Sequence, residues 1–300
     1  MKKGMQKLAA AVVLAVALGL LAGCGGTSEG KGSIKVGSKP FTESLVVSEI
    51  YALALEDAGY QVERVPGIAG SVIHTALVNN EIDLYPEYTG TGLLSILKLP
   101  MESDPQAVYD TVKAEYDKQF HITWLNPSPA NDSQGLVIKT SLADRLGIKT
   151  ISDLQANASS IRFASQGTFD EREDGIKGLE KLYGTFNWAS STVYENSLKY
   201  QVLKNDQADA APAYTTEGQL VNTEEFRVLE DDKHFWPPYN LTPVVRNAVL
   251  EQHRDIAEIL NAISPSLTTE AVISLNAQVD VEGKEYEAVA KEFYESIKKQ

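Results

Sequence analysis

The stretch Ile82-Asp83-Leu84-Tyr85-Pro86-Glu87-Tyr88-Thr89-Gly90-Thr91-Gly92 leaves an apolar segment and passes directly into hydroxyl groups and glycines. This pattern predicts a strand over residues 82–85 and a helix that begins at Gly90. Two more strands and two more helices are predicted upstream, at residues 34–37, 44–58, 61–65 and 70–80. Strand, helix, strand, helix and strand in this order predict βαβ units and a parallel sheet.

A second α/β series follows later in the chain. Its predicted strands and helices lie at residues 161–164, 170–184, 195–203 and 208–213. Two such series in 300 residues predict two lobes with separate cores, because domains are typically about 100–150 residues long. Ligands of open α/β sheets bind beyond the carboxyl ends of the strands, so we expect a ligand cleft between the lobes.

The start of the chain predicts export. Three lysines precede an apolar run over residues 8–21, as in a secretory signal peptide, and the run is too short to span a bilayer. The segment that ends at Cys24, the only cysteine, resembles a bacterial lipobox, in which the thiol carries a lipid. The alternative is a signal peptide that happens to end near a cysteine. We expect a signal peptide over residues 1–23 and a lipid-anchored flexible leash over residues 24–33.

Composition excludes several classes of function. The formal net charge is −14, which argues against nucleic acid binding and against electrostatic adhesion to an anionic membrane. No motif of a serine hydrolase, zinc protease, phosphate loop or dinucleotide-binding turn is present. The four histidines are scattered along the chain, at His74, His121, His234 and His253. We therefore expect no catalytic residues, no metal site and no cofactor.

Tyr88 and Thr91 are the first candidates for ligand contact. They lie three residues apart, so on the first turn of a helix they share a face. Glycines there let a ligand approach the backbone, and the free N–H groups of a first helical turn favour an anion. An ordinary strand-to-helix loop with a half-buried tyrosine explains the same spacing equally well.

Six motifs follow one another along nearly the whole chain after the leash: GSKPFTE (37–43), IDLYPEYTGT (82–91), NDSQGL (131–136), FDEREDG (169–175), AYTTEG (213–218) and FWPPYN (235–240). Together they resemble the substrate-binding proteins of ABC importers for glycine betaine, choline and related compatible solutes. The resemblance implies an α/β, two-lobed periplasmic-binding-protein fold of type II, with the ligand cleft between the lobes.

The resemblance also implies an aromatic box around a quaternary ammonium group, formed by Tyr88, Tyr214 and Tyr239. A trimethylammonium group cannot donate strong hydrogen bonds, so tyrosine π-faces recognise it, at about 0.5–2 kcal/mol per face. Asp132 falls where the family places an acidic or amide group near the cation. A role of Asp132 as a cap or turn residue remains the alternative.

For the carboxylate end of the ligand, the resemblance implies Lys39, Thr91 and Arg172. The planar fork of arginine suits a carboxylate because two parallel N–H groups meet its two oxygens. Alternatively, Arg172 pairs with its acidic neighbours on a solvated helix face. Adjacent residues of a helix do not face each other, which weakens that alternative.

One position departs from the family. Where the family usually has a fourth tyrosine, this chain has Gln134, and an amide offers hydrogen bonds instead of a π-face. The box is then three-sided, weaker for simple betaine, or fitted to a larger ligand with a polar group, such as carnitine or ergothioneine. Three tryptophans are candidates for the missing face, although such residues are more often core: Trp124, Trp188 and, first among them, Trp236.

We expect lobe one to comprise residues 34–133 and 245–300, and lobe two residues 134–244, with hinge crossings near Ser133 and Val244. The implied function is capture of glycine betaine, choline, carnitine or a similar compound for an ABC transporter permease. The expected protein is a monomer without enzymatic activity, tethered outside the cytoplasmic membrane by its lipid. Three alternatives stay open: the same fold with an unrelated solute such as an amino acid, an extracytoplasmic sensor domain, and an enzyme.

Overall fold

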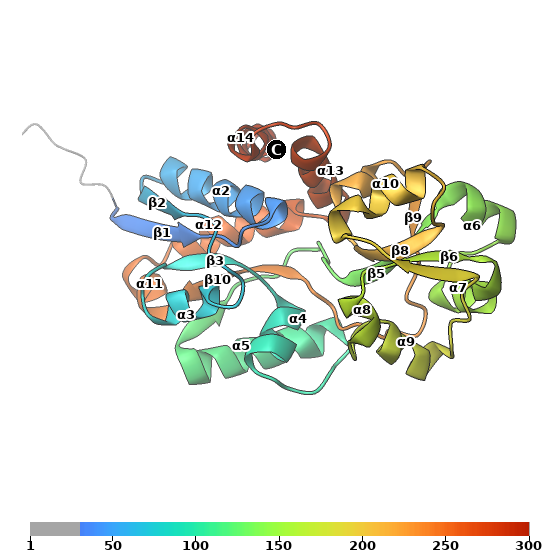
Figure 1. Ribbon diagram of the computed structural model, residues 1–300. Coiled ribbons are helices and arrows are strands. Elements are labelled where there is room, and N and C mark those ends of the chain that lie inside the picture. The colour runs from blue at the N-terminus through green and yellow to red at the C-terminus, as the bar shows by residue number, and fades with distance from the viewer. Residues whose placement is uncertain (1–30, 300) are drawn as a thin grey trace, which may run out of the picture.

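Two α/β lobes lie side by side in the computed structural model, which describes residues 31–299 (Figure 1). Each lobe contains a five-stranded mixed sheet, with strand order β2-β1-β3-β10-β4 in the first and β7-β6-β8-β5-β9 in the second. The predicted fold class is therefore confirmed. The predicted signal peptide and Cys24 lie outside the described residues.

The strands of the first lobe are β1 (Ser33–Gly37), β2 (Gln61–Val65), β3 (Leu84–Tyr88), β4 (Ile122–Trp124) and β10 (Leu241–Arg246). Its helices are α2 (Thr42–Asp57), α3 (Ile73–Val78), α4 (Thr89–Thr91), the π-helical turn η1 (Gly92–Ile96), α5 (Pro105–Phe120), α11 (Asn247–Gln252), α12 (Ile256–Ile263), the 3₁₀ turn η5 (Ser264–Ser266), α13 (Thr269–Asp280) and α14 (Tyr286–Ile297). α2 packs against α12, α13 and α14 over one face of the sheet. α3 and α5 cover the other face.

The strands of the second lobe are β5 (Gln134–Lys139), β6 (Arg162–Ser165), β7 (Ser190–Val193), β8 (Ala210–Tyr214) and β9 (Phe226–Val228). Its helical segments are α6 (Thr140–Leu146), α7 (Ile151–Ala156), η2 (Ala158–Ser160), α8 (Thr168–Glu171), α9 (Ile176–Tyr183), η3 (Asn196–Leu198), α10 (Lys199–Lys204) and η4 (Gly218–Val221). Leu136 and Ile138 of β5 enter one core cluster while Val137 enters the other, as the two-residue period of a strand requires.

β10 corrects the predicted boundary between the lobes. It lies in the first sheet, antiparallel to both β3 and β4, and its pairing with β3 begins at Leu241. The expected limit between residues 244 and 245 therefore falls inside a strand of lobe one. Pro243 hides this strand from a sequence-based prediction, because proline cannot donate to a sheet. In the structure Pro243 lies opposite Pro86 of β3.

Two further expectations need correction. The predicted leash ends too late, since Ser33 already pairs with β2 and the Lys31 backbone N–H donates to the Gly59 carbonyl at 3.1 Å. The helix expected over residues 170–184 is two helices, α8 and α9, because Arg172 between them has an extended backbone. Among residues 31–299, no helix combines the length and the apolar character needed to cross a membrane.

The two segments that cross between the lobes lie next to each other. Asn131 and Asn240 form an antiparallel bridge, and the Asp132 backbone N–H donates to the Tyr239 carbonyl at 3.1 Å. The strands β1 and β3 of lobe one and β6 and β8 of lobe two end towards this region (Figure 1). The crossing segments and these strand ends together position the site described next.

Candidate ligand-binding site

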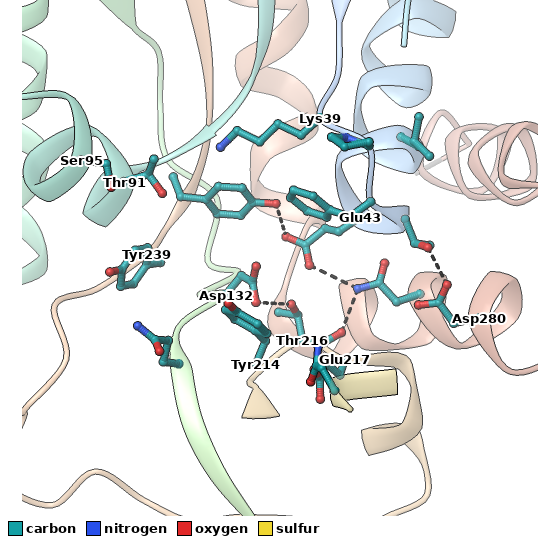
Figure 2. A pocket seen from close by; sticks show the side chains of 18 of the residues that line it. Lys39, Glu43, Thr91, Ser95, Asp132, Tyr214, Thr216, Glu217, Tyr239 and Asp280 are labelled. Carbon is teal, nitrogen blue, oxygen red and sulfur yellow. Dashed lines mark hydrogen bonds between the residues drawn. The ribbon is translucent and has the colours of Figure 1, made fainter. Parts of the chain in front are cut away.

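A cavity of about 680 Å³ lies between the lobes, and side chains from both lobes and from the crossing segments line it (Figure 2). Tyr88 and Thr91 come from lobe one, Arg172 and Tyr214 from lobe two, and Asp132 and Tyr239 from the crossing segments. The structure thus brings together all eight residues proposed from the sequence: Lys39, Tyr88, Thr91, Asp132, Gln134, Arg172, Tyr214 and Tyr239.

The ring of Tyr88 is largely occupied by other protein groups. Its hydroxyl donates to Glu43 Oε1 at 2.8 Å, and the Lys39 ammonium lies 5.0 Å from the centre of its ring. Lys39 in turn forms a buried ion pair with Glu87. One face of Tyr88 therefore already holds a cation of the protein, and Tyr88 is only 4 % exposed.

Tyr214 and Tyr239 offer more open rings. Tyr214, at the end of β8, is 45 % exposed, and Tyr239 is partly exposed in the crossing segment (Figure 2). Within residues 31–299 neither hydroxyl donates a hydrogen bond to another residue, so both rings are held by packing alone. Burial raises the pKa of Tyr239 to about 12. Both side chains are therefore neutral phenols at neutral pH.

Gly90 leaves room for the ring of Tyr239 because glycine has no side chain. A Cβ at position 90 would lie 2.7–2.8 Å from three carbons of that ring, which is closer than van der Waals contact permits. We expect Gly90→Ala to push Tyr239 out of position, at a cost on the order of 1–3 kcal/mol. The expected result is weaker ligand binding by roughly fivefold or more in a calorimetric titration, with a Tm lowered by a few degrees. Unchanged affinity would show that the ring adapts without leaving the site.

Two carboxyl groups, Glu43 and Asp132, face the cavity near each other (Figure 2). Glu43 is 3 % exposed and accepts hydrogen bonds from Tyr88 and from Asn276 Nδ2, the latter at 3.2 Å. Asp132 accepts from the Thr216 hydroxyl at 2.7 Å. Burial raises the pKa of both groups, and for Asp132 the negative charge of Glu43 raises it further. Because desolvation and mutual repulsion disfavour two negative charges here, a cation placed between them is stabilised.

Arg172 belongs to a polar cluster with Asp174 and Gln134. Its Nε donates to Asp174 Oδ1 at 2.6 Å and its Nη2 to Asp174 Oδ2. Gln134 Nε2 donates to the same Oδ2 at 2.8 Å. The pairing of Arg172 with an acidic neighbour therefore occurs after all, since the extended backbone at Arg172 brings the two side chains to one side. The guanidinium still lines the cavity with donors that Asp174 does not use.

Several lining residues were not singled out from the sequence. They are Phe41, Glu43, Thr216, Glu217, Asn276 and Asp280. Phe41 lies beside Tyr88, with ring centres 6.3 Å apart, and is 40 % exposed. Four of them lie inside motifs that the sequence analysis had recognised, so membership of a motif could have identified them: Phe41, Glu43, Thr216 and Glu217. Asn276 and Asp280 lie on α13, whose approach to the cleft no local pattern reveals.

The tryptophans do not replace the missing tyrosine. Trp124 is fully buried beneath Gly92, and Trp188 stacks on Phe163 with ring centres 4.4 Å apart. Trp236 is 6 % exposed and donates from Nε1 to the Asp174 carbonyl at 2.8 Å. All three belong to the lobe cores, which is the more ordinary of the two roles considered for them. Trp236 supports the site indirectly, by holding the backbone of Asp174.

The chemistry of the cavity favours binding of a cation. Its lining contains five carboxyl groups, of Glu43, Asp132, Asp174, Glu217 and Asp280, and two basic groups, of Lys39 and Arg172. Both basic groups already have an acidic partner, and Glu217 pairs with Lys199. Within the described residues, the lining carboxyl groups that form no ion pair are those of Glu43, Asp132 and Asp280. Within the described residues, no group of three or more histidine, cysteine, aspartate or glutamate side chains is arranged to hold a metal ion.

Comparison with known proteins identifies related sequences. A family model described as the substrate-binding domain of ABC-type glycine betaine transport systems matches residues 32–296. The ergothioneine transport permease/ergothioneine binding protein EgtU of Helicobacter pylori strain G27 is 33 % identical over 264 residues, which are 87 % of this chain and 47 % of EgtU. The chain thus spans about half the length of that relative.

A second relative matches over nearly its full length. The carnitine transport binding protein OpuCC of Listeria monocytogenes is 30 % identical over 301 residues, which cover 98 % of this chain and 96 % of OpuCC. Among solved structures, one described as a glycine betaine/carnitine/choline ABC transporter superposes with a TM-score of 0.83 at 26 % identity, over 88 % of this chain and 97 % of that one.

Proposed function

Because the chain belongs to the family of substrate-binding domains of ABC-type glycine betaine transport systems, we propose that its interlobe cavity captures a quaternary ammonium compound. The candidate ligands are glycine betaine, choline, carnitine and a larger betaine such as ergothioneine. The family is one of binding components rather than enzymes, and its members act outside the cytoplasmic membrane with a permease. We propose the same partner for this chain.

One observation carries the proposal: an excess of carboxyl groups and open tyrosine rings line the same cavity, and both basic groups there are already paired. A permanently charged methylated nitrogen needs no hydrogen-bond acceptor, so ring faces and nearby carboxylates are the groups that can stabilise it.

The two ends of the proposed ligand contact different groups: its head is the methylated nitrogen, and its tail is the carboxylate or other polar end. Tyr214 and Tyr239 enclose the methylated nitrogen, with Tyr88 contributing the part of its ring that Lys39 leaves free. Asp132 supplies the attractive charge. The unused N–H groups of Arg172 and the hydroxyl of Thr91 hold a carboxylate or another polar tail. Lys39 has a smaller role than expected, since Glu87 already neutralises it.

Capture is proposed to involve closure of the lobes about the two crossing segments. Lobe one comprises the residues before about 130 and from Leu241 onward, and lobe two those from Gln134 to about Trp236. Asp132 and Tyr239 lie in the crossing segments, so movement of the lobes changes their surroundings directly. We further propose that the protein is a monomer tethered through a lipid on Cys24.

Calorimetric titration of the purified protein tests the proposal. The panel comprises glycine betaine, choline, carnitine, ergothioneine and tetramethylammonium, with common amino acids as primary-ammonium controls. We expect saturable binding of at least one quaternary ammonium compound and none of the amino acids. Binding of amino acids alone would contradict the proposal.

Arg172→Ala separates recognition of the tail from recognition of the head. Loss of the guanidinium removes a charge-assisted partner of a ligand carboxylate, so carnitine should bind about tenfold more weakly. Choline has no carboxylate, so it should lose much less affinity than carnitine does. The measurement is the ratio of the two dissociation constants. Equal losses for both ligands would show that Arg172 only supports the structure.

A further inference from the structure

We propose that Gln134 selects among quaternary ammonium ligands by accepting a hydrogen bond, so that the protein prefers ligands whose tail carries an O–H or N–H donor. This inference rests on the proposed function and specifies the ligand class further. Three observations support it: the orientation of the Gln134 amide, the absence of a hydrogen-bond donor to its oxygen within residues 31–299, and the cavity beside it.

Asp174 fixes the orientation of the Gln134 amide. Gln134 Nε2 donates to Asp174 Oδ2 at 2.8 Å, and Arg172 Nε donates to Asp174 Oδ1 at 2.6 Å. Burial raises the pKa of Asp174, but the hydrogen bonds from Arg172 and Gln134 outweigh it and lower the pKa overall. An ionised carboxylate can only accept hydrogen bonds, so the NH₂ end of the amide must face Asp174. The amide oxygen therefore points away from it.

That oxygen has no partner in the protein. Within residues 31–299 no group donates to Gln134 Oε1, and this atom is not among the polar atoms sealed off from the cavity. The residue as a whole is only 8 % exposed, so its oxygen is a fixed acceptor at the cavity surface. A bound ligand without a donor would exclude water from this atom and leave it unpaired, which weakens binding.

Gln134 also lies where the tail of a ligand would pass. It is directly opposite Tyr214 in the antiparallel pair of β5 and β8, so both side chains lie on the same face of the sheet. With its head against Tyr214, a ligand brings its next atoms close to the amide.

The space beyond Gln134 accommodates a longer molecule. A second cavity of about 450 Å³ shares Gln134, Arg172 and Tyr214 with the main cavity, and Phe169 and Tyr194 also line it. A compact ligand such as glycine betaine has neither a donor for Gln134 nor atoms to fill this space. A hydroxyl-bearing chain or a heterocycle with an N–H group has both.

Two matched ligand pairs test the inference on the full protein. The first is choline and its O-methyl ether, and the second is carnitine and 4-trimethylammoniobutanoate, which is carnitine without its hydroxyl. In each pair the head is unchanged and the hydroxyl donor is removed, by methylation in the first pair and by replacement with hydrogen in the second. We expect the donor-bearing member to bind roughly tenfold more tightly in calorimetric titrations, a difference of about 1.4 kcal/mol.

Gln134→Leu should reduce this preference to within about twofold, since a leucine of similar size accepts no hydrogen bond. Gln201→Leu makes the same change at an exposed glutamine of α10 and should leave the preference intact. Equal affinities within both pairs for the unaltered protein, or a preference that survives Gln134→Leu, would overturn the inference alone. Failure of all four ligands to bind would instead contradict the proposed function. The comparison of ligands needs no variant, so it stands even if Gln134→Leu does not fold.

Discussion

Tyr214→Ala is expected to weaken the binding of every quaternary ammonium ligand tenfold or more. Tyr214 lines the cavity and is 45 % exposed. Loss of a desolvated cation–π contact costs up to about 2 kcal/mol, and each tenfold change in affinity corresponds to about 1.4 kcal/mol. Calorimetric titration measures the affinity, and thermal unfolding should show little change in Tm because an exposed side chain is removed.

Tyr214→Phe is the matched control. The Tyr214 hydroxyl donates to no residue within positions 31–299, so its removal leaves the ring and its surroundings in place. Affinity should stay within about threefold of the unaltered protein. A phenylalanine variant as weak as the alanine variant would assign the effect to the hydroxyl, and an alanine variant of normal affinity would remove Tyr214 from the site.

Asp132→Asn is expected to have the second large effect, a loss of tenfold or more in affinity for choline. The change keeps the shape of the side chain and its contact with the Thr216 hydroxyl, but it removes the charge nearest the proposed cation. Two unit charges about 4 Å apart attract by about 4 kcal/mol at an effective dielectric constant of 20, which sets an upper limit for the effect. A change below twofold would show that Asp132 is a turn residue without a part in binding.

The pH dependence of choline binding should have a definite sign. Burial and the charge of Glu43 raise the pKa of Asp132 in the free protein, whereas a bound cation favours the ionised carboxylate and lowers that pKa. Binding therefore releases a proton, and affinity should rise with pH through the titration of Asp132, since choline itself does not titrate. Asp132→Asn should flatten this profile. Affinity that falls with rising pH would contradict the assigned charge state.

Asp280→Asn is the control for both measurements. Asp280 lines the same cavity but is exposed, so solvent and salt screen its charge. We expect a change of less than about twofold in affinity and an unchanged pH profile. A loss as large as that of Asp132→Asn would mean that the net charge of the cavity, rather than one placed carboxylate, determines binding.

Local sequence patterns predicted the two α/β series. They did not predict which additional strands complete each sheet. Alternating apolar residues predicted β1, because a strand with one buried face repeats every two residues. The strand predicted at residues 82–85 overlaps β3 only at Leu84 and Tyr85. β10 escaped prediction because Pro243 is atypical of a central strand. β7 escaped because all four of its residues are exposed, which leaves no apolar alternation to detect.

The same contrast holds for the cavity. Eight residues that line the cavity were predicted because each lies in one of the six motifs that resemble the family. The ion pairs and hydrogen bonds among the lining residues were not predicted, because they join residues that lie far apart in the sequence. The Lys39–Glu87 ion pair joins positions 48 residues apart, and Asn276 reaches Glu43 across 233 residues. The Arg172–Asp174 pair was missed for a local reason, since one helix was expected where the backbone is extended.

The most direct test of charge recognition compares choline with 3,3-dimethylbutan-1-ol, in which a carbon atom replaces the charged nitrogen and the shape is kept. Both are titrated into the unaltered protein under identical conditions. If tyrosine rings and carboxylates hold a permanent cation, choline should bind at least about a hundredfold more tightly, a difference of about 2.7 kcal/mol. Equal affinities of the charged and neutral compounds would show that the cavity recognises shape alone, and the assignment of a quaternary ammonium site would be wrong.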